Sequence, residues 1–202
     1  DHQRDVRARL RADAGWAGVQ VDGPHGGPRN VSGGDEQFLM FNVLNPAALR
    51  DNVRQSALEL VRVLDGIGDW SIDASDCDGH AAGGGPLRLD TRNAVVIGHS
   101  MGATIAPLVL AASPQVRATI LSGAGASYVE NVIHKTKPLE VRPVAEALLG
   151  YDALGRTLQP FDPMLSLVQW AAEAADPPVY ELATAATMHA LAFQGIGDHY
   201  IL

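Results

Sequence analysis

The sequence is poor in cysteine, in basic residues and in long hydrophobic runs, and each shortage excludes a class of protein. Cys77 is the only cysteine among 202 residues, which excludes a disulfide framework within the chain. The formal net charge of −8 argues against nucleic acid as a partner, because surfaces that bind nucleic acids are basic. No run approaches the ~20 apolar residues that a membrane-spanning helix needs. The sequence also lacks a phosphate-binding glycine loop and a coherent set of metal ligands, so we expect no cofactor.

The residues that are present predict a folded α/β domain. Hydrophobic residues make up 47% of the chain, enough for a sizeable core. Segments with helical spacing alternate with short apolar runs, which is typical of a mostly parallel sheet flanked by helices. The predicted elements are a helix over 6–14, a strand over 18–21, a helix from Pro46 to Gly66 after the N-cap Asn45, strands over 94–97 and 116–121 around a helix over 103–112, and a helix that starts at Pro163 after the N-cap Asp162 and ends before Pro177.

The strongest motif lies between the apolar run 94–97 and the helical segment 103–112. It consists of Gly98, His99, Ser100, Met101 and Gly102. A serine between a buried strand and a helix, with glycines two residues away on both sides, is typical of a nucleophile elbow. The alternative is a chance match of G-x-S-x-G in a chain with 21 glycines, and the flanking strand and helix favour the elbow.

With this motif the chain resembles the α/β-hydrolase superfamily of serine esterases and lipases. The resemblance extends to 19–26, similar to an earlier strand and loop, to 116–123, similar to the strand after the elbow, and to 190–198, similar to the strand and turn that carry the acid. It implies a core over 1–127, a helical lid over 128–182, and a last core strand with the acid turn over 183–202.

The resemblance also implies a catalytic apparatus for hydrolysing a small carboxylic ester. Ser100 would be the nucleophile, Asp198 the acid, and the Met101 backbone N–H one oxyanion donor. The alternative for Asp198 is a plain surface turn. The family's histidine follows the acid, so we expect the base beyond residue 202, the second oxyanion donor off this chain, and the chain to be part of a longer enzyme.

Further residues are candidates for the pocket or for the base. Met164 and Trp170 are candidates for the pocket wall, with packing in the core as the alternative. His25 lies on the loop after the first predicted strand, where it lines the site or belongs to a turn. His199 is next to the acid but is poorly placed to turn toward it, and His99 should point away from the nucleophile.

An insertion over 69–90, rich in aspartate and glycine, precedes the elbow strand. An EF-hand loop would need acids where Ala74 and Gly85 stand, so a surface insertion is favoured and cation binding is the alternative. Such insertions occur in some secreted bacterial hydrolases, so the resemblance inclines toward a secreted or periplasmic protein.

A second function from a different class stays open. A catalytically inactive protein with the α/β-hydrolase fold would bind a small apolar ligand or a partner and would lack a base. An elbow and an acid that are both in place favour the enzyme, because a binding protein has no use for a strained serine turn.

Overall fold

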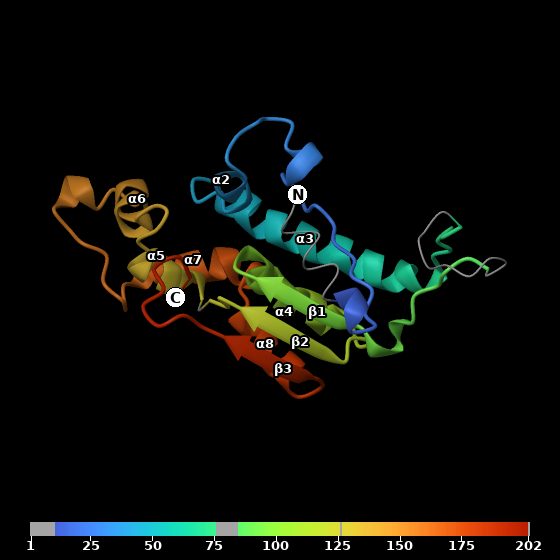
Figure 1. The fold of residues 1–202 in the computed structure, drawn as a ribbon. Coiled ribbons are helices and arrows are strands. Elements are labelled where there is room, and N and C mark those ends of the chain that lie inside the picture. Colours follow the sequence, from blue (N-terminus) through green and yellow to red (C-terminus); the bar gives the residue numbers. More distant parts are fainter. Residues whose placement is uncertain (1–10, 76–84, 126, 202) are drawn as a thin grey trace.

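The computed structural model describes residues 11–75, 85–125 and 127–201, and it contains a parallel three-stranded sheet in the order β1-β2-β3. Helices flank the sheet (Figure 1), an architecture compatible with the predicted α/β class. The strands are β1 (Val95–His99), β2 (Ala118–Ser122) and β3 (His189–Phe193). The helices are α2 (Glu36–Met40), α3 (Pro46–Gly66), α4 (Met101–Ala112), α5 (Tyr128–His134), α6 (Val141–Leu148), α7 (Pro163–Ala172) and α8 (Pro178–Ala185).

Helix α3 has the bounds that its sequence predicts. Asn45 caps it by accepting a hydrogen bond from the Ala48 N–H at 3.1 Å. Pro46 fits the first turn, because a residue there makes no helical hydrogen bond through its N–H. Val53 and Ala57 are buried on the face that packs against α4. The cap and the apolar stripe together place this helix over the core.

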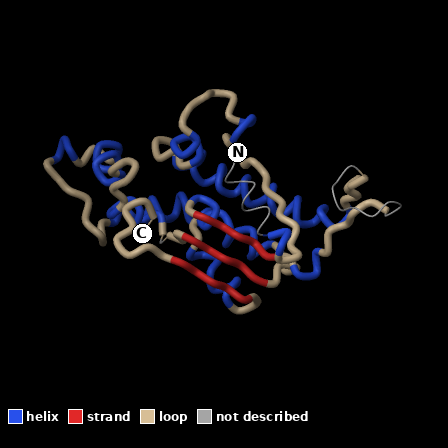
Figure 2. The backbone as a smooth tube through the Cα atoms, viewed as in Figure 1, coloured by secondary structure: helices blue, strands red, loops and turns tan. Residues whose placement is uncertain are grey.

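The sheet is covered on one face and open on the other. Val96 packs into the core cluster that α3 and α4 build, and Thr119 on β2 is buried with it. The opposite face, in front of the helices in Figure 2, carries Ile97, Leu191 and Phe193, whose exposed fractions are 54%, 51% and 54%. Register pairs Ile97 with Ile120 and Ile120 with Leu191, so these side chains form one row across the sheet.

The strand predicted over 18–21 is wrong. These residues form an irregular segment, with Val19 and Val21 nearly half exposed. A strand needs a hydrogen-bonded neighbour, and within the described residues β1 pairs only with β2. Of the helix predicted over 6–14, the described part is helical at 11–13 and ends as expected before Gly15, whose φ is +78°; residues 1–10 lie outside the described ranges.

Among the helices that follow β2, α5 packs against both α6 and α7. Figure 1 shows α5 and α6 beyond the carboxyl ends of the strands. They have a hydrophobic cluster of their own, and α7 begins at the predicted cap, where Asp162 accepts a hydrogen bond from the Met164 N–H. Helix α8 contains residue 182, the end of the segment 128–182 expected to be a lid, and it packs against α4. The buried members of the hydrophobic cluster formed by α5, α6 and α7 are Ile133, Tyr151, Leu158 and Leu165.

No helix in the described parts of the chain combines the length and the hydrophobicity needed to cross a membrane.

Candidate active site

Ser100 occupies a strained backbone conformation at the turn from β1 into α4. Its φ and ψ are 51° and −118°, a combination that costs a non-glycine residue roughly 1–3 kcal/mol. The surrounding hydrogen bonds hold it there. The Ser100 N–H donates to the Ser122 carbonyl oxygen at 2.8 Å, and the Ser100 carbonyl oxygen accepts from the Ala103 N–H at 2.8 Å. The turn therefore has the strand–serine–helix geometry that the motif predicts.

The two glycines of the motif differ in what the fold requires of them. A Cβ at Gly98 would lie 2.5 Å from the Gly102 carbonyl oxygen, and this backbone atom could move only if the helix moved with it. A Cβ at Gly102 would meet nothing within 4 Å. The close approach of β1 to the first turn of α4 therefore depends on Gly98 alone.

The first turn of α4 supplies backbone donors beside Ser100. Met101 is the first residue of the helix, so its N–H has no acceptor within the helix and lies at the positive end of the helix dipole. The Met101 side chain packs against the main core cluster. This packing fixes the peptide that carries the candidate oxyanion donor.

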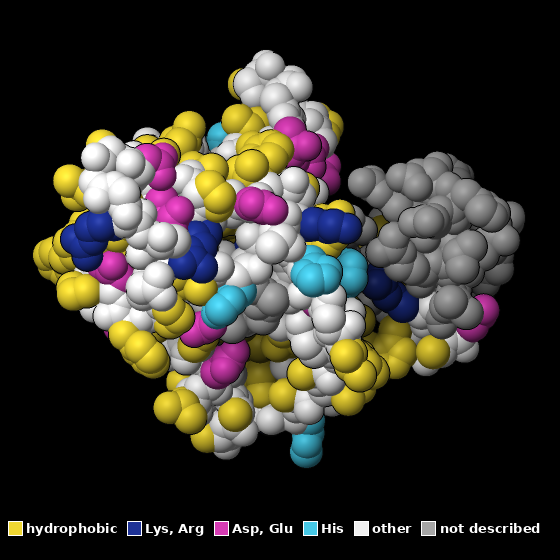
Figure 3. All heavy atoms as spheres, turned by 90° about the vertical axis from the view of Figure 1, so that its left-hand side faces the viewer, with side chains coloured by type: hydrophobic (Ala, Val, Ile, Leu, Met, Phe, Trp, Pro, Cys, Tyr) yellow, Lys and Arg dark blue, Asp and Glu magenta, His cyan; other side chains and the backbone are white. Residues whose placement is uncertain are grey.

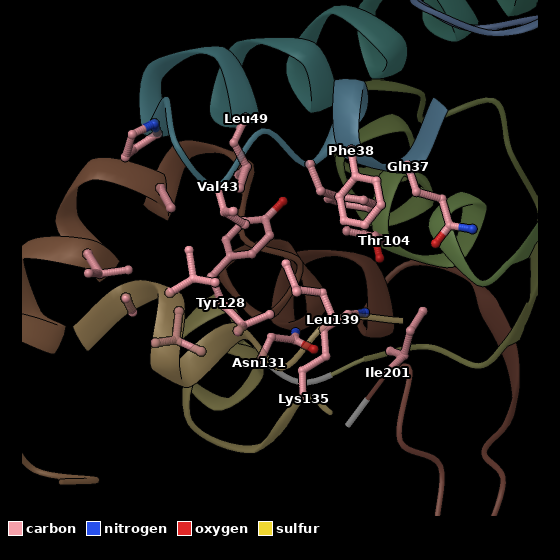
Figure 4. A pocket seen from close by; sticks show the side chains of 18 of the residues that line it. Gln37, Phe38, Val43, Leu49, Thr104, Tyr128, Asn131, Lys135, Leu139 and Ile201 are labelled. Carbon is pink, nitrogen blue, oxygen red and sulfur yellow. The ribbon is translucent and has the colours of Figure 1, made fainter. Parts of the chain in front are cut away.

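A large, mostly aliphatic cavity of about 650 Å³ opens beside the elbow. Residues 99–102 and Thr104 form one wall, and α2, α5, α6, α7 and residues 200–201 form the others. Figure 4 shows Phe38, Leu49 and Leu139 among the side chains around it. Figure 3 views this end of the molecule, where hydrophobic side chains reach the surface between charged ones. A volume of this size suits a small organic molecule.

Of the three predicted pocket residues, the structure places one on the cavity wall and two elsewhere. Met164 lines the cavity, whereas His25 and Trp170 do not. His25 lies in a turn closed by the Gly26 N–H on the Gly23 carbonyl oxygen, and its φ is +62°. Trp170 is 77% exposed and borders a separate hollow on the outer side of α7 together with Phe161.

Asp198 lies in the turn after β3, and its carboxylate is held by the chain that follows it. Its Oδ1 accepts hydrogen bonds from the backbone N–H groups of Tyr200 at 2.8 Å and Ile201 at 3.2 Å. These bonds, with smaller contributions from the charges of Lys135 and His199, lower the pKa of Asp198. Asp198 does not line the cavity, but Tyr200 and Ile201 do.

The end of α5 is tied to the segment around Asp198. Lys135 Nζ donates a hydrogen bond to the Tyr200 carbonyl oxygen. The N–H groups of Thr136 and Lys137 both donate to the His199 carbonyl oxygen, at 3.3 and 3.1 Å. Burial lowers the pKa of Lys135, which also lines the cavity. The helix and the acid turn are therefore one connected unit.

The histidines near the elbow are not arranged as a catalytic base. His99 lines the cavity, and its Nδ1 lies 3.2 Å from Ser122 Oγ, so its ring turns toward β2. Within the described ranges, no histidine ring is hydrogen-bonded to Ser100 or to Asp198. His189 starts β3 at its amino end, and Ser100 follows the carboxyl end of β1, so the two lie at opposite edges of the parallel sheet.

The predicted insertion is closed at its base by a bridge between Ile72 and Leu87. Asp73 accepts a hydrogen bond from the Ser75 N–H. Residues 76–84, which form much of the segment considered for cation binding, lie outside the described ranges. In the parts of the chain that are described, no group of three or more His, Cys, Asp or Glu side chains could hold a metal ion.

Sequence reasoning missed several polar residues that line the cavity, Tyr128 and Lys135 among them. Tyr128 is the first residue of α5 and Lys135 is the residue after its end, and no sequence motif marks either of them. The packing of α5 against α6 and α7, which also line the cavity, brings them there. Comparisons of the chain with known protein families, with curated proteins and with solved structures return no match.

Proposed function

We propose that this protein is a serine hydrolase of the α/β-hydrolase type that acts on carboxylic esters, with Ser100 as its nucleophile. The observation that carries the proposal is the strained turn of Ser100 on the wall of an apolar cavity. Strain of this kind persists where the surrounding structure enforces it, commonly at catalytic sites. A residue at this position without catalytic use would be expected to relax to an ordinary conformation or to be glycine.

In the proposed reaction, Ser100 Oγ attacks the ester carbonyl carbon while a histidine base takes its proton. The carbonyl oxygen becomes an oxyanion that accepts a hydrogen bond from the Met101 N–H. Collapse of the intermediate breaks the ester C–O bond, and the histidine returns the proton to the leaving alcohol. Water then hydrolyses the acyl-enzyme by the same steps, which releases the acid and restores Ser100.

Asp198 is proposed to orient that histidine. Its Oδ2 is not engaged by the backbone bonds that hold Oδ1, and its lowered pKa keeps it ionised at neutral pH. In the chain order that the resemblance implies, the histidine base follows the acid. The helices over 128–182 are proposed as a lid, because α5, α6 and α7 contribute walls of the cavity.

The second candidate is a binding protein with the same fold and no turnover. The aliphatic cavity supports it, since such a cavity would hold an apolar ligand whether or not a reaction follows. It predicts that Ser100 reacts no faster than an ordinary serine.

Labelling with a fluorophosphonate separates the two functions. The whole protein is incubated with the probe, and the adduct is located by peptide mass spectrometry, with Ser100→Ala and Ser122→Ala as variants. Ser122 lies beside His99 at the same edge of the sheet, so its variant controls for changes near the elbow. An adduct on Ser100 that survives in Ser122→Ala supports the hydrolase. Folded protein without an adduct contradicts it and favours the binding protein.

A further inference from the structure

Tyr128 brings a polar group into the apolar cavity. It is the first residue of α5, it is 9% exposed, and it packs with the main hydrophobic cluster. Its backbone N–H donates to Asp176 Oδ1 at 3.2 Å, which fixes the start of the helix. Figure 4 shows the phenol ring among the lining side chains, with its hydroxyl directed to the side where Val43 and Phe38 lie.

The Tyr128 hydroxyl has no hydrogen-bond partner within the described residues. In the described parts of the chain it shares this state with one other buried side-chain atom, Ser113 Oγ. Of the two, only Tyr128 lines the cavity. A buried hydroxyl without a partner is unfavourable, so it calls for a reason other than stability.

The same fold satisfies two other tyrosine hydroxyls. Tyr151 donates to Asp162 Oδ1, and Tyr180 donates to the Ala174 carbonyl oxygen, both at 2.8 Å. Tyr180 packs against the same hydrophobic cluster as Tyr128. The difference between the tyrosines is therefore the presence of an acceptor, and Tyr128 lines the cavity in which a ligand would bring one.

The surroundings of Tyr128 keep its phenol protonated. Burial, and then the charge of Asp176, raise its pKa well above the usual range. Both oxygens of Asp176 are already engaged, Oδ1 by the Tyr128 N–H and Oδ2 by Gln169 Nε2 at 2.7 Å. The hydroxyl is thus a donor at neutral pH, and the nearby carboxylate disfavours an anionic acceptor.

We propose that the Tyr128 hydroxyl binds substrate by donating a hydrogen bond to a neutral oxygen, of the ether, ketone or hydroxyl type, within the apolar chain that fills the cavity. For the ester part of that substrate the inference rests on the proposed hydrolase function. Tyr128 then determines specificity, because a site built around a buried donor discriminates against chains that leave the donor unpaired.

The test compares p-nitrophenyl esters of a straight acyl chain with a series in which one methylene at a time is replaced by an ether oxygen. For one position of the ether oxygen in the acyl chain, we expect the wild type to have a higher kcat/KM for the ether ester than for the all-carbon ester. Tyr128→Phe should reduce that preference by about 5- to 10-fold, as expected for loss of one neutral hydrogen bond, because its kcat/KM falls more for the ether ester than for the all-carbon ester. Tyr180→Phe, which loses a satisfied hydroxyl nearby, should leave the preference unchanged.

Thermal unfolding supplies an independent readout. Tyr128→Phe should melt at or above the wild-type temperature, because it removes an unpaired hydroxyl without changing the shape of the side chain. Tyr180→Phe should melt below it. A Tyr128→Phe variant that melts well below the wild type would mean that the hydroxyl is paired within the fold, which overturns the proposal.

Failure of the proposed function is distinguished by calorimetric binding of the same esters to Ser100→Ala. If the wild type turns over no ester, tighter binding of one ether chain that Tyr128→Phe abolishes in this background still supports the donor role. Equal affinity of ether and all-carbon chains with and without the hydroxyl overturns it, and so does the absence of binding by any chain in the series.

Discussion

At Ser100 the backbone strain and the candidate chemistry belong to the same residue. A φ of 51° with a ψ of −118° is accessible to glycine at little cost but is unfavourable for any residue with a Cβ. Replacing the serine therefore separates two effects, loss of the hydroxyl and relief of the strain. Stability measurements on such variants report on the strain whether or not the protein is an enzyme.

We expect Ser100→Gly to be more stable than Ser100→Ala by about 1 kcal/mol. The relief of strain, roughly 1–3 kcal/mol, exceeds the larger entropy that glycine has in the unfolded chain, about 0.4–1 kcal/mol. Urea unfolding of the two variants measures the difference. At Ser122, in the strand β2, the order should reverse, with Ser122→Ala more stable than Ser122→Gly. The same order at both positions would contradict the strain.

A second residue whose environment has a measurable consequence is Asp176, which is 1% exposed. Burial raises its pKa above the ordinary value. A raised folded-state pKa contributes stability at pH values below the unfolded pKa, and this contribution is lost as the pH rises through the folded value. We therefore expect the wild type to lose stability relative to Asp176→Asn as the pH rises from about 4. Thermal melts across pH 3–8 measure this change.

Asp162 provides the control with the opposite sign. Hydrogen bonds from the Met164 N–H and the Tyr151 hydroxyl lower its pKa. A lowered folded-state pKa contributes stability above the unfolded pKa, which is lost as the pH falls through the folded value. The wild type should therefore lose stability relative to Asp162→Asn as the solution is acidified. Profiles that slope in the same direction for the two variants would contradict one of the two assignments.

At the scale of elements, the junction of β1 with α4 rests on one close backbone contact. Gly98→Ala is expected to reduce the free energy of unfolding by about 1–3 kcal/mol, because its Cβ would collide with the backbone of Gly102. Gly102→Ala should be neutral or slightly stabilising, since alanine favours a helix and the space is open. Chemical denaturation of both variants tests the pair, and equal losses would contradict the contact.

Local signals predicted the elements that carry their own boundaries. Asn45 with Pro46, and Asp162 with Pro163, are caps that act within one helical turn, so α3 and α7 begin where the sequence predicts. The segment 18–21 has the alternation of a strand but depends on a partner that lies elsewhere in the chain. Such a partner is not encoded locally, which is why this prediction failed.

The elbow and the cavity differ in the same way. The serine turn follows from five adjacent residues and their flanks, so the sequence could predict its position. The cavity joins α2, the start of α4, helices α5 to α7 and the end of the described chain. The face of α7 that carries Trp170 points away from it, a matter of helix rotation that the apolar pattern of α7 did not settle.

At the scale of the whole molecule, the chain builds two hydrophobic clusters rather than one. The first joins α3 and α4 to the sheet and includes Tyr128 of α5 and Ala172 of α7, and the second joins α5, α6 and α7. Leu158 is fully buried in the second cluster, whereas Leu191 on the open face of the sheet is 51% exposed. The same substitution at the two leucines therefore measures how much each region contributes.

Leu158→Ala is expected to cost about 2–5 kcal/mol, as for other fully buried leucines, and Leu191→Ala much less. Because Leu158 belongs to the second cluster, the loss should fall first on the helices that surround it. Hydrogen exchange should then accelerate in α6 while α4 keeps its protection. Uniform acceleration in both helices would show that the two clusters unfold as one.

The hydrogen bond from the Ser100 N–H to the Ser122 carbonyl oxygen continues the β1–β2 pairing by one residue past the strand. The Gly123 N–H does the same toward Phe193 on β3. The Ser100 N–H therefore makes the last hydrogen bond of the β1–β2 pairing, and we expect this bond to break only when the two strands separate. In a partly unfolded state that has lost the outer helices but kept the sheet, the amide of Ser100 should still exchange slowly, and the serine should still be presented in its strained form.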